Sequence, residues 1–167
     1  MKNLLSITLL SFILFSCTTN CNYVQVKIDR ATKKPLYQEV VFQNGMSQEE
    51  MYLKANVWLA RYFVDSKSVI SYSDAKSGYI IGKGTFTVYG GAVQMGYVTY
   101  VIEVLVKDGK SKISIDQFSS ELYGFMTGIP NENYPYEDCI YSKIDKHSQD
   151  IINNFKNNAF KPTSSEF

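Results

Sequence analysis

The chain has 167 residues, a length that suits a single domain with a short leader. It carries 17 Lys and Arg against 16 Asp and Glu, and removal of a leader that contains Lys2 would balance the two signs. Because nucleic-acid-binding proteins usually have a basic excess or a basic face, we expect no nucleic-acid partner. A domain of about 150 residues buries enough surface to form a core without a metal or a disulfide.

The first segment has the layout of a secretory signal. One Lys precedes a run of Leu, Ile and Phe about a dozen residues long, and small residues follow. This run is shorter than the roughly 20 residues of a membrane-spanning helix. Residues 14–17 (Leu-Phe-Ser-Cys) resemble the lipobox of bacterial lipoproteins, in which the Cys becomes the first mature residue and carries lipid. We therefore predict a signal peptide over residues 1–16 and lipidation at Cys17, with ordinary signal cleavage as the alternative.

The predicted lipid would place the protein in the cell envelope. Acyl chains stabilise membrane attachment by about 0.8 kcal/mol per buried CH₂, and more than one chain anchors a protein stably. Thr18 stands where an inner-membrane retention signal would resemble Asp, so the resemblance implies an outer-membrane lipoprotein. No acidic cluster follows Cys17, which favours the periplasmic side. Residues 17–22 would form a lipidated tether to a domain over 23–160, and 161–167 a polar tail.

Apolar patterning predicts the first elements of this domain. A weakly alternating segment over 23–28 precedes a clear strand over 36–42. The clearest helix spans 47–63, where Ser47 and Glu50 form a capping box. Six apolar residues recur on it at spacings of three and four and predict a core-facing stripe: Met51, Ala55, Trp58, Leu59, Tyr62 and Phe63.

Two further strands are predicted over 68–72 and 79–89. Alternation places five small or apolar residues on one face of the longer strand: Ile80, Gly82, Gly84, Phe86 and Val88. Glycines on a sheet face allow another element to pack closely. We therefore expect a helix to lie over Gly82 and Gly84.

The central feature of the sequence is a hairpin over 97–118. Its Asp108-Gly109 loop favours a type I′ turn, in which both central residues have positive φ. A two-residue turn here pairs Lys107 with Lys110. The resulting register gathers the apolar residues on one face, with Val98, Tyr100, Ile102, Val104 and Val106 on the first strand, and with Ile113 and Ile115 opposite Val104 and Ile102 on the second.

A loop-like segment over 121–138 precedes a second helix over 139–160. On this helix, apolar residues at helical spacing predict a stripe that faces the core: Ile140, Ile144, Ile151, Ile152, Phe155 and Ala159. Taken together, the patterns predict an α+β domain whose elements follow the order strand, helix, four strands, helix.

Local patterns between residues 36 and 118 also resemble a known family. They are Trp58-Leu59-Ala60, Ser73-Asp74, Gly78-Tyr79-Ile80, Gly82-Lys83-Gly84, Tyr100, and Lys107-Asp108-Gly109-Lys110. In this order they resemble bacterial envelope proteins described only as a domain of unknown function with a TATA-binding-protein-like (TBP-like) fold. The resemblance implies a curved antiparallel sheet of about five strands with two helices on one face, in the order β-α-β-β-β-β-α. It implies no catalytic residue and no cofactor, and a fold alone does not imply DNA binding.

The only histidine does not complete a convincing metal or catalytic site. His147 lies near Asp145 and Asp150 in the sequence, but these spacings do not put all three on one helical face. A zinc site normally needs three or four ligands. We therefore predict that His147 is exposed and inert, and that the protein holds no metal.

Two other patterns also fall short of known sites. Residues 82–85 (Gly-Lys-Gly-Thr) lack the spacing of a phosphate-binding loop and lie within a predicted strand. Glu103 and Asp116 share the second face of the hairpin, but they are not directly opposite in the predicted register, so we assign no glycosidase pair. An envelope compartment would permit a disulfide between Cys21 and Cys139, although two free thiols are the favoured alternative.

The second face of the hairpin and of its neighbouring strand mixes aromatic and polar residues, as contact surfaces do. We predict an interaction surface there: Tyr79, Lys83, Thr85, Thr87, Tyr89, Tyr97, Thr99 and Glu103. The favoured function is a lipid-anchored, non-enzymatic envelope domain that binds a protein, peptide or glycan. An envelope hydrolase with its site in the 121–138 loop is the alternative, and a structural component of an envelope complex is a third possibility.

Overall fold

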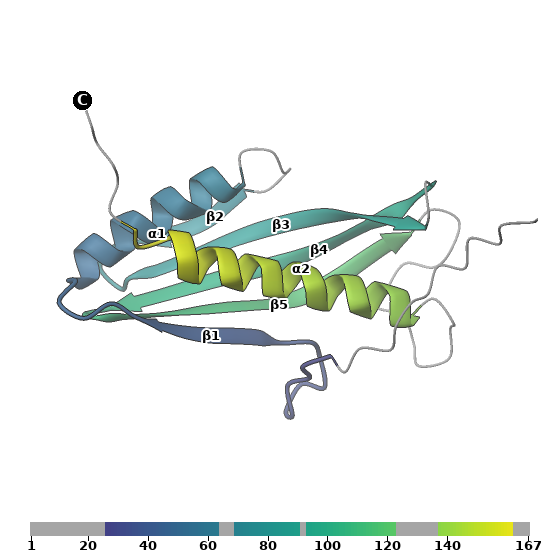
Figure 1. Ribbon diagram of the computed structural model, residues 1–167, viewed down its shortest axis with the longest axis horizontal. Helices are drawn as coiled ribbons and strands as arrows, with labels where there is room; N and C mark the ends of the chain where they lie inside the picture. The colour runs from purple at the N-terminus through teal and green to yellow at the C-terminus, as the bar shows by residue number, and fades with distance from the viewer. Residues whose placement is uncertain (1–25, 64–68, 91–92, 123–136, 162–167) are drawn as a thin grey trace, which may run out of the picture.

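The computed structural model describes residues 26–63, 69–90, 93–122 and 137–161. They form a five-stranded antiparallel sheet in the order β1-β5-β4-β3-β2, with both helices on one face (Figure 1). The elements are β1 (Tyr37–Phe42), α1 (Gln48–Tyr62), β2 (Val69–Asp74), β3 (Tyr79–Gly90), β4 (Val93–Lys107), β5 (Lys110–Leu122) and α2 (Glu137–Asn158). The predicted α+β class and the order β-α-β-β-β-β-α are confirmed.

One predicted strand is wrong in its described part. In the segment 23–28, Ile28 forms only an isolated bridge with Pro35. The next residue reverses the chain, because the Asp29 carboxylate accepts hydrogen bonds from the backbone N–H groups of Ala31 and Thr32. The peptide groups are therefore committed to a turn rather than to a sheet ladder.

The central hairpin has the predicted register but a different turn. Lys107 pairs with Lys110, and the predicted apolar residues of both hairpin strands face the helices. Gly109 has a φ of +70°, whereas Asp108 is not in the positive-φ region, so the type I′ prediction is wrong. The turn is docked against the start of α1: the Asp108 carboxylate accepts the Gln48 N–H at 2.7 Å, and the Gly109 N–H donates to the Met46 carbonyl at 2.9 Å. These contacts select the turn conformation.

The core lies between the sheet and the two helices. Both predicted helical stripes are buried except for Tyr62, which is half-buried. Helix α1 begins as predicted, with the Ser47 hydroxyl accepting the Glu50 N–H at 3.2 Å. A Cβ atom at Gly82 would lie 3.2 Å from the Leu59 side chain, so α1 does pack over this glycine.

The expectation that a helix also covers Gly84 is wrong. The ring of Tyr100, its cross-strand partner, occupies the space where a Cβ atom at residue 84 would lie. An aromatic ring laid across a glycine in the neighbouring strand covers backbone that would otherwise be exposed. Gly84 therefore makes room for Tyr100, and Tyr100 in turn contacts α2 through His147.

Candidate binding surface

The face of the sheet opposite the helices is the candidate surface, and we call it the open face. No helix or strand that the structure describes covers it (Figure 1). All eight residues predicted from the sequence lie on β3 and β4, with their positions alternating onto this face. The register places Thr85 opposite Thr99 and Thr87 opposite Tyr97. The structure thus brings the predicted set together on two adjacent strands.

These eight residues are not equally accessible. Tyr89 is half exposed, and Lys83 and Thr87 are also exposed. The other five are half-buried by their neighbours on the face: Tyr79, Thr85, Tyr97, Thr99 and Glu103. A partner that binds here would therefore contact Tyr89 and Lys83 first.

Sequence reasoning missed apolar residues on the two edge strands. Val40 and Phe42 on β1 are 46% and 67% exposed, and Tyr72 on β2 is 50% exposed. Val40 lies opposite Lys112 and Phe42 opposite Lys110, so both side chains are on the open face. The run Val40-Val41-Phe42 shows no alternation of polarity, and only the pairing of β1 with β5 reveals which side chains are left uncovered.

Two carboxylates lie in the middle of the open face. Glu103 pairs with Ser114 and Val101 with Asp116, so Glu103 and Asp116 are diagonal neighbours, as the predicted register implied. Burial raises the pKa of Asp116, and the nearby charge of Glu103 raises it further. Burial and a hydrogen bond donated to Glu103 raise the pKa of the Tyr79 hydroxyl to about 12. Glu103 is therefore engaged as a hydrogen-bond acceptor.

The prediction that His147 is exposed is wrong. Its Nε2 atom lies 3.0 Å from the Tyr100 hydroxyl, and its ring centroid is 4.3 Å from that of Phe86. Burial lowers the pKa of His147, and the Asp150 carboxylate opposes this in part. His147 follows Ile144 by three residues and precedes Ile151 by four, so it belongs to the inner stripe of α2. That spacing was the signal for its burial.

Within the described residues, no group of three or more His, Cys, Asp and Glu side chains could hold a metal ion. Neither described helix is long and apolar enough to cross a membrane.

The sequence also matches a protein-family model. It is described as a domain of unknown function (DUF4468) with TBP-like fold, and it matches residues 37–121, just over half of the chain. The chain belongs to this family. The matched DUF4468 segment contains α1 and the whole sheet except the last residue of β5. The predicted resemblance to a TBP-like family is confirmed.

Solved structures share the fold of this DUF4468 chain. A DUF4468 family protein from Bacteroides ovatus matches with a TM-score of 0.66 and 16% identity, over 82% of this chain and 92% of that one. A TBP-like protein from Parabacteroides distasonis matches with a TM-score of 0.65 and 12% identity, over 78% and 95% of the two chains. No curated protein matches the sequence. The similarity therefore establishes the fold and leaves the function to be inferred from the surface.

Several sequence predictions lie outside the described residues of this DUF4468 chain. They include the signal peptide over 1–16, the lipidated Cys17 and the side chains of the Cys21–Cys139 pair. The proposed hydrolase loop falls almost entirely within residues 123–136, which also lie outside the description.

Proposed function

We propose that this protein is a non-enzymatic interaction module of the cell envelope, anchored through lipid on Cys17, whose open face binds a protein, peptide or glycan. One observation carries the binding part of the proposal. The opposite face of the sheet is packed beneath two helices, whereas the open face carries exposed large apolar and aromatic side chains from one edge to the other: Val40, Phe42, Tyr72 and Tyr89.

The composition of the open face supports binding. Its exposed rings and aliphatic groups stand among hydroxyl groups and lysines, such as Thr87, Lys83 and Lys112. Contact surfaces combine apolar anchors with a polar surround in this way. The anchored state rests on the leader, whose apolar run and terminal Leu-Phe-Ser-Cys resemble those of lipoproteins.

The open face can be tested by affinity capture with the full chain. Cross-linked envelope extracts would be compared between the wild-type protein and the Tyr89→Ala/Tyr97→Ala double variant. We expect recovery of a specific partner to fall at least tenfold, which corresponds to about 1.4 kcal/mol. Ile28→Ala is a matched control, because it removes a side chain that is 46% exposed but lies outside the five strands. Unchanged recovery with the double variant would remove the open face from consideration.

The anchor needs a separate test. Detergent phase partitioning and metabolic labelling with a fatty-acid analogue would be applied to the wild-type protein and to Cys17→Ala. We expect the wild-type protein to be labelled and to enter the detergent phase, and the variant to lose the label. Equal behaviour of the two proteins would contradict the lipid anchor without bearing on the open face.

A further inference from the structure

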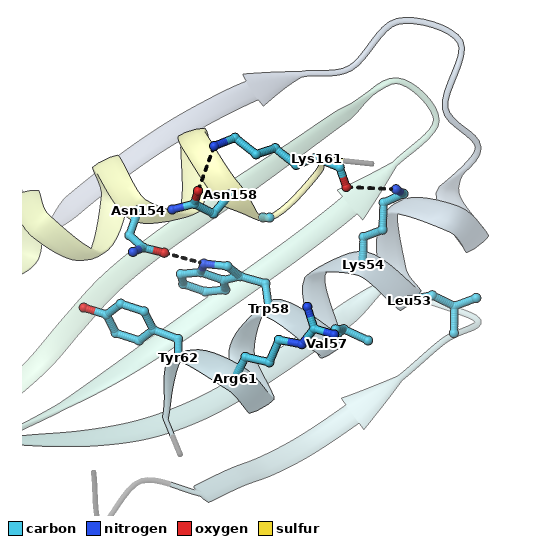
Figure 2. A pocket seen from close by; sticks show the side chains of 10 residues that line it. Leu53, Lys54, Val57, Trp58, Arg61, Tyr62, Asn154, Asn158 and Lys161 are labelled. Carbon is cyan, nitrogen blue, oxygen red and sulfur yellow. Dashed lines mark hydrogen bonds between the residues drawn. The ribbon is translucent and has the colours of Figure 1, made fainter. Parts of the chain in front are cut away.

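A cleft of about 710 Å³ lies between α1 and the end of α2, on the helical layer of the molecule (Figure 2). It is separate from the open face, since the sheet lies between them. Its volume is within the range of about 300–1,000 Å³ that is typical of ligand sites. The side chains that line it combine three cations, two amides and exposed aliphatic groups, without a carboxylate.

The cations of the cleft are Lys54, Arg61 and Lys161. Two of them are held in place: the Lys54 Nζ atom donates to the Lys161 carbonyl at 3.3 Å, and the Lys161 Nζ atom donates to the Asn158 amide oxygen at 3.1 Å (Figure 2). The nearest ion-pair partner of Lys54 is Glu50, at 3.8 Å. The Arg61 side chain is exposed and forms no hydrogen bond or ion pair with any residue that the structure describes. Its planar guanidinium group can receive a carboxylate through two parallel hydrogen bonds.

An aliphatic ridge lies beside these cations. Leu53 and Val57 are one helical turn apart on α1 and are 58% and 47% exposed. Both line the cleft. Basic side chains near a helix C-terminus also complement the helix dipole, but that role does not account for two exposed aliphatic side chains next to them. The combination fits a ligand that carries both negative charge and an apolar group.

The side chains at the floor of the cleft already hydrogen-bond and stack with one another. The Trp58 Nε1–H donates to the Asn154 amide oxygen at 2.8 Å, and the indole stacks on Tyr62 with 5.2 Å between ring centroids. Trp58 is only 6% exposed, so its ring offers no open platform on which a sugar could stack. The Asn154 oxygen is occupied, which leaves its NH₂ group as the donor for a ligand.

The position of the cleft selects the kind of anion. It is built from the later turns of α1 and the last turn of α2, where the helix dipoles present partial negative charge. Phosphate groups favour the opposite end of a helix. These helix ends repel a singly charged carboxylate less than a doubly charged phosphate, and the side-chain cations supply the attraction that a carboxylate needs.

We propose that the cleft binds an acidic peptide. Its carboxylates pair with Arg61 and the two lysines, an apolar side chain lies on the Leu53–Val57 ridge, and its backbone accepts hydrogen bonds from the amide of Asn154. This binding is independent of the open face and adds a second recognition site to the protein.

The only tryptophan of the chain provides the test, because Trp58 forms the floor of the cleft. The full chain would be titrated with a peptide of alternating Glu and Leu while the indole N–H and Asn side-chain signals are followed by NMR. We expect saturable shifts of the Trp58 and Asn154 signals. The same peptide with Gln in place of Glu should bind at least tenfold more weakly, since charged hydrogen bonds contribute more than neutral ones.

Two variants that each lose one positive charge separate the site from general electrostatics. Arg61→Gln should weaken binding of the acidic peptide about tenfold. Lys146→Gln removes the same charge from an exposed position of α2 that does not line the cleft, and it should leave the affinity unchanged. Equal losses in both variants, or equal binding of the Glu and Gln peptides, would overturn the proposal. Trp58 shifts produced by phosphatidylglycerol vesicles but not by the acidic peptide would also overturn it, in favour of a membrane surface.

Discussion

Asp108 joins the central hairpin to the start of α1, and its replacement should weaken both. Its carboxylate accepts the N–H of Gln48, the first residue of the helix, across 60 positions of sequence. Ser47 satisfies a different N–H, that of Glu50. The amino end of α1 is therefore capped partly from within and partly by the hairpin turn.

The expected cost follows from the two contributions that Asp108→Ala removes. Loss of a capping acceptor costs about 0.5–2 kcal/mol, and loss of a negative charge at a helix N-terminus costs about 0.3–1 kcal/mol at an exposed site. We expect the free energy of unfolding to fall by about 1.5 kcal/mol, which lowers Tm by about 5 °C for a domain of this size. Asp108→Asn keeps an acceptor and loses only the charge, so it should cost less than half as much.

Urea unfolding and amide hydrogen exchange test this reasoning. Exchange should accelerate most in the first turn of α1, because the Gln48 N–H loses its acceptor. Lys110→Ala, on the exposed side of the same turn, is the control and should change stability by no more than about 0.5 kcal/mol. An Asp108→Ala protein that matches the wild type in both measurements would show that the turn does not cap the helix.

Three further predictions concern buried groups. Burial lowers the pKa of His147, so just below pH 6.5 the unfolded chain binds more protons than the folded protein. The free energy of unfolding should therefore fall as the pH is lowered from 7 to 5. His147→Gln should flatten this dependence, and an unchanged slope in urea titrations would contradict the prediction. Gly84→Ala should destabilise the protein by about 1–3 kcal/mol, since the new methyl group would overlap the Tyr100 ring. Gly82→Ala would place its methyl group 3.2 Å from Leu59 and 3.3 Å from Phe63, a milder contact, so it should cost less. The reverse order in thermal melts would refute this packing. Because burial raises the pKa of Asp116 above its unfolded value of 3.8, stability is lost as the pH rises through the folded pKa. Asp116→Asn should remove this loss, and a variant less stable than wild type at pH 7 but not at pH 3 would contradict the assignment.

The amino-acid sequence predicts much of this fold because many of its determinants are local. The hairpin register follows from a two-residue loop and from alternation on both sides of it, and the structure pairs Lys107 with Lys110 as expected. Both helices follow from apolar residues at spacings of three and four. The burial of His147 was available from the same spacing, but the prediction compared it only with the two neighbouring aspartates.

Other features depend on contacts between segments far apart in the chain. The turn type at Asp108 depends on the hydrogen bond that its carboxylate accepts from the Gln48 N–H. The local preference of an Asp-Gly sequence does not include this distant contact. The cleft exists because the end of α2 lies beside α1, where Asn154 hydrogen-bonds to Trp58 across 96 positions of sequence.

The sequence by itself determined the class, the element order and the apolar faces of β3, β4 and β5, because alternation and helical spacing act between near neighbours. Only the tertiary structure decided that β1 lies beside β5, and hence that Phe42 is left uncovered at one edge of the open face. It also decided that Arg61 and Lys161 line one cleft. Strand order and helix placement are set by packing of the whole chain, because the free energy is lowered by the assembled core and not by any single segment.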